Sequence, residues 1–358
     1  MKKDYQKLSI AAHKKARGKI SVISKMPLKN RHDLSIAYTP GVAGPALAIA
    51  KNKKLAYDLT ATKNGVAIIS DGSAVLGLGN IGPEAALPIM EGKAVLFKHF
   101  AGLDGFPIVL GTQDTEEIIA AVKSVAPTFG AINLEDISAP RCFEIEEKLK
   151  KELDIPVMHD DQHGTAVVVL AGLINALKVV RKKKENVKVV INGCGAAGVA
   201  ITKLLHLYGF KNIILCDSQG VVSKKRIDLT KIKKNILKIT NKKNLSGHLA
   251  DALLEADIFV GVSKANTLNA SDVKSMNKGA IIFALANPTP EIMPDLARTA
   301  GARVVASGRS DFPNQINNVL AYPGIFKGVL EARAKQITDK MKIAAALALA
   351  GVIKNPTA

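Results

Sequence analysis

The sequence contains no tryptophan, and aromatic residues make up only 4% of its 358 residues. Proteins that bind single-stranded nucleic acid stack the bases on aromatic side chains, so this composition argues against that class. Cysteine is also scarce, and Cys142, Cys194 and Cys216 show neither a CxxC pair nor another metal-binding spacing. A sparse, odd set of cysteines is typical of a reducing compartment, which favours a cytoplasmic protein.

Long apolar segments are missing as well. The first 30 residues carry repeated lysines without a long apolar core, so we expect no secretory signal peptide. The most apolar stretches, residues 166–177 and 343–353, are too short to span a bilayer. We therefore expect a protein that does not associate with membranes.

Acidic residues are outnumbered, with 31 against 50 basic residues and a net charge of +19. Most of the basic residues are lysines, which cluster at residues 181–184, 224–226 and 231–243. Nucleic-acid readers usually combine such clusters with several arginine and aromatic residues, whereas these clusters contain only Arg181 and Arg226 and no aromatic residue. We interpret them as a solvated surface and expect no nucleic-acid partner, although a positive field would attract small dianionic substrates.

The apolar content of 47% and the length allow two compact domains. Short apolar runs bounded by turn residues alternate with helical patterns, which predicts an α/β fold with parallel sheets. Between residues 131 and 165, two such runs each end in a pair of acids, Glu135-Asp136 and Asp160-Asp161. The carboxyl ends of neighbouring parallel strands meet at one edge of a sheet, where α/β proteins bind ligands. Four carboxylates there would require a cation, and oxygen ligands favour Mg²⁺ or Mn²⁺; the alternative is two solvated acidic loops.

A dinucleotide-binding motif occupies residues 187–205. A predicted strand runs into Gly193-x-Gly195-x-x-Gly198 and then into an amphipathic helix, and the next strand ends in Asp217, about 20 residues later. Gly193 would form the turn, Gly195 would let the backbone approach the pyrophosphate, and Gly198 would let the helix pack on the strand. Asp217 would bind the ribose hydroxyls; the alternative is a doubly wound domain that binds nothing.

Four further residues are candidates for chemistry. Tyr38 precedes a Thr-Pro-Gly turn, where we expect the end of a strand, and is either a packed aromatic or a proton donor. Lys93 follows a glycine at which we expect a helix over residues 83–100 to break, and it enters an apolar run. Lys93 therefore either extends to solvent or is desolvated, and desolvation would lower its pKa and make it a base. Asn287 and Asn318 follow apolar runs and either cap turns or bond a substrate carboxylate.

Together these segments resemble the malic enzymes, in particular the small bacterial type. The resemblance extends over nearly the whole chain, and its motifs are jointly specific. The matching segments are residues 37–43, 71–79, 91–93, 134–136, 159–165, 193–198, 286–289 and 317–318.

The patterns and the resemblance predict an α/β protein of two domains and a tail. The expected parts are an N-terminal α/β domain for metal and substrate (1–162), a doubly wound Rossmann-type NAD(P)-binding domain (163–330) and a C-terminal helix (331–358).

The resemblance also implies roles for the matching residues. Tyr38 matches the proton donor of the family, Lys93 its proton acceptor, and Asp160 a carboxylate that supports the base. The implied metal ligands are Glu135, Asp136 and Asp161, the dinucleotide loop is Gly193, Gly195, Ala196, Ala197 and Gly198, and the residues that contact substrate and nicotinamide are Asn287 and Asn318. Larger malic enzymes grip the substrate carboxylate with an arginine where Ala74 stands here, which leaves Ser73 as a candidate.

The implied reaction is oxidative decarboxylation of (S)-malate to pyruvate and CO₂ with reduction of NAD or NADP. Asp217 favours NAD, because a carboxylate repels the 2′-phosphate of NADP, whereas Lys224, Lys225 and Arg226 could offset that repulsion. The alternatives are a malolactic enzyme that uses the same sites without releasing reduced cofactor, and a non-catalytic dinucleotide-binding or nucleic-acid-associated protein. We expect a homodimer, because small α/β enzymes of this kind often pair by two-fold symmetry.

Overall fold

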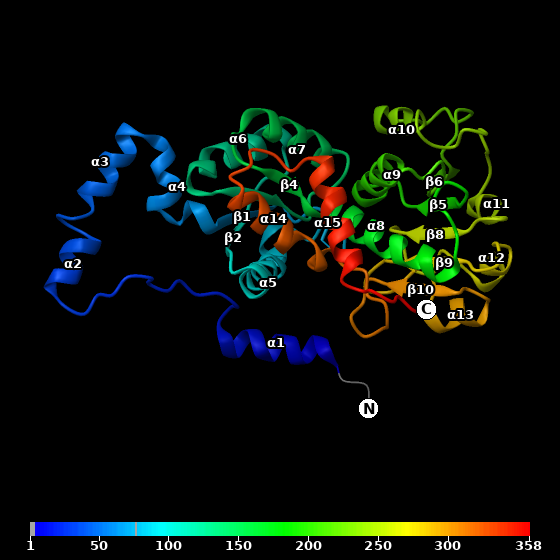
Figure 1. The fold of residues 1–358 in the computed structure, drawn as a ribbon, viewed down its shortest axis with the longest axis horizontal. Helices are drawn as coiled ribbons and strands as arrows, with labels where there is room; N and C mark the ends of the chain where they lie inside the picture. The colour runs from blue at the N-terminus through cyan, green and yellow to red at the C-terminus, as the bar shows by residue number, and fades with distance from the viewer. Residues whose placement is uncertain (1–3, 76) are drawn as a thin grey trace.

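The computed structural model describes residues 4–75 and 77–358 and contains two parallel sheets joined by a long helix (Figure 1). The first sheet has the order β2-β1-β3-β4. Its strands are β1 (Gly65–Ser70), β2 (Asp104–Val109), β3 (Ala131–Leu134) and β4 (Val157–His159), and its helices are α5 (Pro83–Ala101), α6 (Thr115–Val125) and α7 (Arg141–Glu152). Every residue of β1 and β3 is buried, as expected for continuous apolar runs in a sheet covered on both faces.

The second sheet has the order β10-β9-β8-β5-β6-β7, in which only β7 is antiparallel to its neighbour among the strands described. Its strands are β5 (Lys188–Asn192), β6 (Asn212–Asp217), β7 (Gly220–Val221), β8 (Ile258–Gly261), β9 (Ile281–Ala284) and β10 (Val304–Ser307). Its helices are α9 (Ala196–Tyr208), α10 (Lys231–Ile236), α11 (Leu249–Leu253), α12 (Ala270–Lys274) and α13 (Pro294–Thr299). Strand β5 lies between β6 and β8, so the strand order reverses at β5, where doubly wound folds bind their ligands.

Helix α8 (Asp160–Val180) begins at the end of β4 and packs against α9 and the C-terminal helix α15 (Asp339–Gly351). One cluster of buried apolar side chains runs from the first sheet through α8 to the second sheet. Within the described residues, α8 is the one helix long and apolar enough to span a membrane, but 56% of its apolar window is buried inside the fold. The apolar stretch at residues 166–177 forms only part of this helix, which also includes the polar turn from Asp160 and the last turn up to Val180.

After β10 the chain returns to the first sheet through η4 (Asn318–Leu320) and α14 (Tyr322–Glu331). The ring of Phe97 on α5 contacts Tyr322 and Phe326 edge-on, at centroid distances of 4.8 and 5.3 Å. Helix α14 therefore packs beside α5 (Figure 1), although more than 200 residues separate the two elements. Residues from the end of the chain thus reach the edge of the first sheet.

The N-terminal arm, defined here as residues 5–51, extends away from both sheets (Figure 1) and contacts the first one through Lys19 with Glu91 of α5 and Lys25 with Asp104 of β2. It contains α1 (Tyr5–Ala16), α2 (Arg31–Ala37) and α3 (Ala43–Lys51), and α4 (Ala56–Leu59) follows it; none of these helices has a buried residue. Large apolar side chains of the arm are exposed, including Val22 at 96%, Ile23 at 72% and Leu47 at 63%. An apolar surface of this kind marks an interaction site.

Two local expectations were wrong. Helix α5 does not break at Gly92 but runs unbroken through it, because a single glycine inside a helix costs only about 1 kcal/mol and tertiary packing overrides it. Tyr38 directly follows helix α2 instead of closing a strand, so the Thr-Pro-Gly turn ends a helix. In both cases a glycine- or proline-containing turn signal was misinterpreted. Whether such a signal ends a helix, ends a strand or is tolerated inside a helix depends on tertiary packing, which the local sequence does not reveal.

Candidate active site

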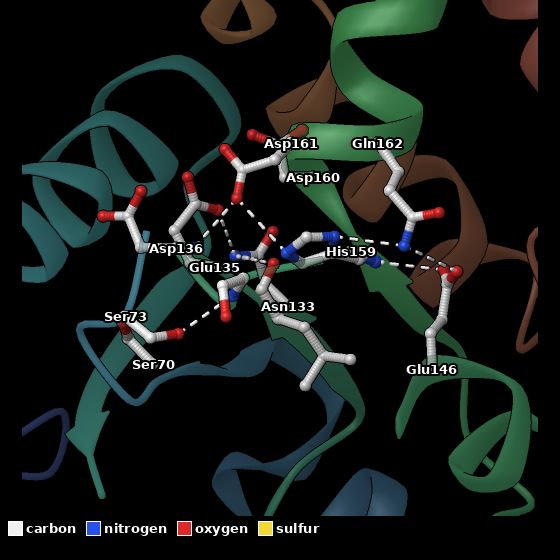
Figure 2. Close-up of polar contacts among 12 residues, drawn as sticks. Ser70, Ser73, Asn133, Glu135, Asp136, Glu146, His159, Asp160, Asp161 and Gln162 are labelled. Atoms are coloured by element: carbon white, nitrogen blue, oxygen red, sulfur yellow. Dashed lines mark hydrogen bonds and ion pairs between the residues drawn. The ribbon is translucent and has the colours of Figure 1, made fainter. Parts of the chain in front are cut away.

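The two acid pairs meet at one edge of the first sheet (Figure 2). Strands β3 and β4 are parallel neighbours with Leu134 opposite His159, so the residues that follow the two strands lie side by side. One carboxylate oxygen from each of Glu135, Asp136 and Asp161 lies within 4.8 Å of the others. The structure therefore brings together the three acids that the sequence nominated as metal ligands.

The backbone of this edge supports a cation site. Asp136 has a left-handed φ of 53°, and its N–H donates to Asp161 Oδ2 at 2.8 Å, while Asn133 Nδ2 donates to Glu135 Oε2 at 2.9 Å. Glu135 and Asp136 are only 4% and 3% exposed. Buried like charges are costly unless a positive charge compensates them, and three hard oxygen donors fit Mg²⁺ or Mn²⁺.

Lys93 on α5 points into this acidic cluster. Its Nζ lies 2.5 Å from Glu135 Oε1 and 2.6 Å from Asp160 Oδ2, and 4.2 Å from the centre of the Tyr322 ring. Burial alone would lower the Lys93 pKa, but the charges of Asp160 and Glu135 outweigh it and hold that pKa well above its usual range. Lys93 is therefore buried, as one of the two alternatives required, but its pKa is raised rather than lowered.

A cleft of about 640 Å³ connects this cluster to the glycine loop of the second sheet. Its walls include Lys93, the three clustered acids, Gly195, Ala196 and Ala197, together with Asn317, Asn318 and Tyr322. The C-terminal edges of both sheets therefore open into one space. A ligand in it would contact the acids on one side and the N-terminus of α9 on the other.

The glycine loop after β5 has the close packing that a dinucleotide motif requires. Gly193 has a φ of +129°, and a Cβ there would lie 2.5 Å from the carbonyl oxygen of Val262. A Cβ on Gly198 would lie 1.7 Å from the Gly193 oxygen, whereas a Cβ on Gly195 would meet nothing within 4 Å. Gly193 and Gly198 are thus required for packing, and the open space at Gly195 suits the approach of a pyrophosphate.

Asp217 ends β6, as predicted, but its carboxylate is held by two cations. Arg226 Nη1 lies 2.7 Å from Asp217 Oδ1, and Lys233 Nζ on α10 lies 2.6 Å from Asp217 Oδ2. The hydrogen bonds from Arg226 and Lys233 outweigh burial and lower the Asp217 pKa. Of the basic residues proposed from the sequence, Arg226 makes this contact, while Lys224 and Lys225 are exposed.

Comparison with known proteins identifies the family. The family model described as "Malic enzyme, N-terminal domain" matches residues 17–150, and the one described as "Malic enzyme, NAD binding domain" matches residues 162–358. The chain is 56% identical over 344 residues to the bifunctional malic/malolactic enzyme of Bacillus subtilis, covering 96% of this chain and 84% of that protein. It is 58% identical to the NAD-dependent malic enzyme of Geobacillus stearothermophilus, covering 94% and 70% of the two chains.

Solved structures agree. The crystal structure of NAD-dependent malic enzyme from Thermotoga maritima superimposes with a TM-score of 0.92 at 52% identity, covering 94% of this chain and 90% of that one. The chain belongs to the malic enzyme family. Both the family resemblance and the α/β fold with a Rossmann-type domain are thereby confirmed.

The proton donor expected of a malic enzyme lies outside the cleft of its own chain. Tyr38 is 66% exposed on the N-terminal arm, whereas Lys93 lies buried at the sheet edge. Tyr38 is not among the described residues that line the cleft. The role of Tyr38 remains a prediction, and within this one chain the structure does not bring it to Lys93.

The polar residues nominated for the malate carboxylate divide into two groups. Asn318 lines the cleft, as does Asn317, whereas Asn287 is half-buried in the loop after β9 and does not line it. The Ser73 hydroxyl donates to Asp71 Oδ1 at 2.6 Å and accepts from the Ser138 N–H and from Arg141 Nη2, each at 2.9 Å. A hydroxyl has one proton and two lone pairs, so Ser73 is fully engaged in supporting the loop after β3.

Two residues of this malic enzyme site escaped the sequence analysis. Tyr322 is 1% exposed and its ring covers Lys93, yet it lies on a helix 229 positions later in the chain. Lys233 belongs to a lysine cluster that we interpreted as solvated surface. Neither shows a local signal, because the first resembles an ordinary core aromatic and the second is one lysine among many.

Proposed function

We propose that this protein catalyses the oxidative decarboxylation of (S)-malate to pyruvate and CO₂ with reduction of NAD or NADP, in the cytoplasm. The observation that carries the proposal is the shared cleft, in which three clustered carboxylates, a buried lysine and the dinucleotide loop face one another. A purely dinucleotide-binding domain would not need the acids or the lysine. Membership of the malic enzyme family supports the same reaction.

Glu135, Asp136 and Asp161 would hold the cation, and the loop from Gly193 to Gly198 with Asp217 would hold the dinucleotide. When both are bound, the nicotinamide supplies the hydride acceptor, and the divalent cation polarises the malate hydroxyl and offsets the carboxylate charge beside Lys93. The positive N-terminus of α9 would face the pyrophosphate.

Lys93 Nζ would accept the proton of the malate C2 hydroxyl. Asp160 holds the Nζ at 2.6 Å, and the Tyr322 ring covers it, so the amine has one defined position. Asn318 at the cleft wall would donate its side-chain N–H groups to a malate carboxylate. Tyr38 would return a proton to C3 of enolpyruvate after CO₂ has left.

We further propose that the protein is a homodimer whose N-terminal arms are exchanged, so that Tyr38 acts in the cleft of the partner subunit. The exposed apolar side chains of the arm and the absence of buried residues in α1, α2 and α3 support this arrangement. A second copy of the chain would cover the apolar side chains of the arm, and the same contact would bring Tyr38 into the partner's cleft.

The test is a malate-dependent assay with NAD and with NADP, before and after chelation and with added Mn²⁺. We expect reduced nicotinamide and pyruvate in equal amounts, and loss of both in chelator. Lactate without reduced nicotinamide would instead indicate malolactic chemistry, which one of the relatives above carries in its name. No turnover under any of these conditions would leave only a dinucleotide-binding role.

A further inference from the structure

A buried polar chain lies behind Asp161, outside the cleft (Figure 2). It starts at Glu146 on α7, which is 6% exposed and does not line the cleft. Glu146 Oε1 accepts the backbone N–H of His159 at 3.1 Å, and Oε2 lies 3.3 Å from Gln162 Nε2 and 2.9 Å from His163 Nε2. The Glu146 carboxylate thus contacts His159 at the end of β4 and Gln162 and His163 in the first turn of α8. Asp160 and Asp161 project from the same turn.

The contacts of Gln162 orient the His159 ring. Gln162 Nε2 lies 3.1 Å from His159 Nδ1 and 3.3 Å from Glu146 Oε2. An amide nitrogen can donate to both, whereas the flipped amide would place its oxygen against the Glu146 carboxylate. This arrangement makes His159 Nδ1 the acceptor of the Gln162 amide and turns Nε2 toward Asp161.

His159 Nε2 lies 3.2 Å from Asp161 Oδ2, the same oxygen that accepts the N–H of Asp136 at 2.8 Å. Both nitrogens lie within 3.2 Å of Oδ2, so Asp161 Oδ1 takes part in neither contact. His159 is completely buried, whereas the Asp161 side chain is 32% exposed, so the supporting side of Asp161 is closed to water and the other side is open to the cleft.

We propose that Glu146 is a positioning residue for the cation site and that it acts on Asp161 through Gln162 and His159. The proposal rests on the proposed function, because it requires that Asp161 binds a divalent cation. Partners behind a ligand that fix its orientation are typically worth about 10- to 100-fold in metal affinity. Glu146 touches neither the ligand atoms of the cluster nor the cleft. Any effect of Glu146 on Asp161 must therefore pass through the residues of the turn that Glu146 contacts.

The experiment measures Mn²⁺ binding by titration calorimetry on the full chain without malate. Glu146→Gln removes the double acceptor, and Gln162→Ala removes the link to His159 while leaving the contacts of Glu146 with His159 N–H and His163. We expect about 10- to 100-fold weaker Mn²⁺ binding in each variant, with unchanged NADH binding in the second domain. Glu147→Gln is the matched control, since Glu147 is exposed on the same helix and pairs with Lys151 at 2.7 Å.

A spectroscopic measurement tests the contact between Gln162 and His159 without any metal. The ¹⁵N chemical shifts of the His159 ring should show a protonated Nε2 and an unprotonated Nδ1 in the wild type, and this pattern should be lost in Gln162→Ala. Wild-type Mn²⁺ affinity in Gln162→Ala, or a wild-type ring protonated on Nδ1, would overturn the positioning role alone. Failure of the wild-type protein to bind Mn²⁺ would overturn the metal site and the proposal together.

Discussion

At the scale of single residues, the charge on Lys93 is decided by its neighbours rather than by its burial. Burial disfavours the ammonium form, yet two carboxylates within 2.6 Å stabilise it, and the second effect is larger. A lysine in this setting holds its proton until the carboxylate charge is offset. The carboxylates proposed as metal ligands and the lysine proposed as proton acceptor are therefore coupled electrostatically, and changes at either should affect both.

Asp136→Asn keeps the size of the side chain but removes one charge from the cation site. We expect Mn²⁺ affinity to fall by more than about 100-fold, beyond the usual range for residues behind the ligands, and malate oxidation to fall with it. Calorimetry with Mn²⁺ and fluorescence titration with NADH would check both. Asp154→Asn, at a carboxylate 89% exposed, is the control; near-normal turnover of Asp136→Asn in chelator would contradict the metal assignment.

Lys233 is expected to set cofactor choice together with Asp217 and Arg226. Its ammonium neutralises Asp217, the carboxylate that would otherwise repel a 2′-phosphate, so Lys233→Ala should disfavour NADP. A charge-assisted contact is worth about 1.5–3 kcal/mol, so the kcat/KM ratio of NAD to NADP should rise about 10- to 100-fold. We propose that the wild type favours NAD because Asp217 is fixed at the strand end.

The control for this prediction is Lys234→Ala, the exposed neighbour on the same helix, which should leave the ratio unchanged. An unchanged ratio in Lys233→Ala would assign cofactor choice elsewhere. A wild-type preference for NADP above tenfold, about 1.4 kcal/mol, would mean that the two cations outweigh Asp217.

At the scale of elements, the glycine loop between β5 and α9 separates packing from ligand approach. Gly198→Ala places a Cβ 1.7 Å from the Gly193 oxygen, so the helix must shift and both stability and NADH affinity should fall. Gly195→Ala meets no atom within 4 Å, so this variant should keep the wild-type melting temperature and lose only NADH affinity. Thermal unfolding and NADH fluorescence measure the two effects; equal destabilisation by both variants would contradict the separation.

At the scale of the whole molecule, the exchanged arm predicts complementation between two inactive variants. Tyr38→Phe and Lys93→Ala should each be nearly inactive alone, because loss of a proton-transfer group costs about 10²- to 10⁴-fold. If Tyr38 acts in the partner's cleft, each mixed dimer contains one intact site. Co-expressed variants that pair at random should then recover about one quarter of the wild-type activity.

The control for complementation is the double variant Tyr38→Phe/Lys93→Ala co-expressed with Lys93→Ala. This pair should recover no activity under either arrangement, because Lys93 is absent from both chains. Recovery of activity by the first pair would support the action of Tyr38 across the interface. If mixed dimers are confirmed by mass but recover no activity, Tyr38 acts in the cleft of its own chain. A monomeric mass by light scattering would remove the basis of the arm exchange.

Much of the site could be predicted from local sequence. Acids placed directly after two apolar runs must meet if the runs form neighbouring parallel strands, because such strands end at one edge of the sheet. The meeting of the two acid pairs therefore followed from spacing and strand pairing, whereas the choice of Glu135, Asp136 and Asp161 among the four acids came from the family resemblance. The glycine loop and Asp217 followed in the same way, since their geometry depends on a single βαβ unit.

Only the tertiary structure decided what depends on contacts between distant segments. The Lys93 pKa reflects carboxylates that follow two strands and an aromatic ring 229 positions away, and burial and charge act on it in opposite directions. The contacts of Lys233 with Asp217 and of Glu146 with Gln162 arise because helices α10 and α7 lie next to the ends of β6 and β4. Residue type and order set which groups were available, but distances of 2.5–3.3 Å between segments remote in the chain set what those groups can do.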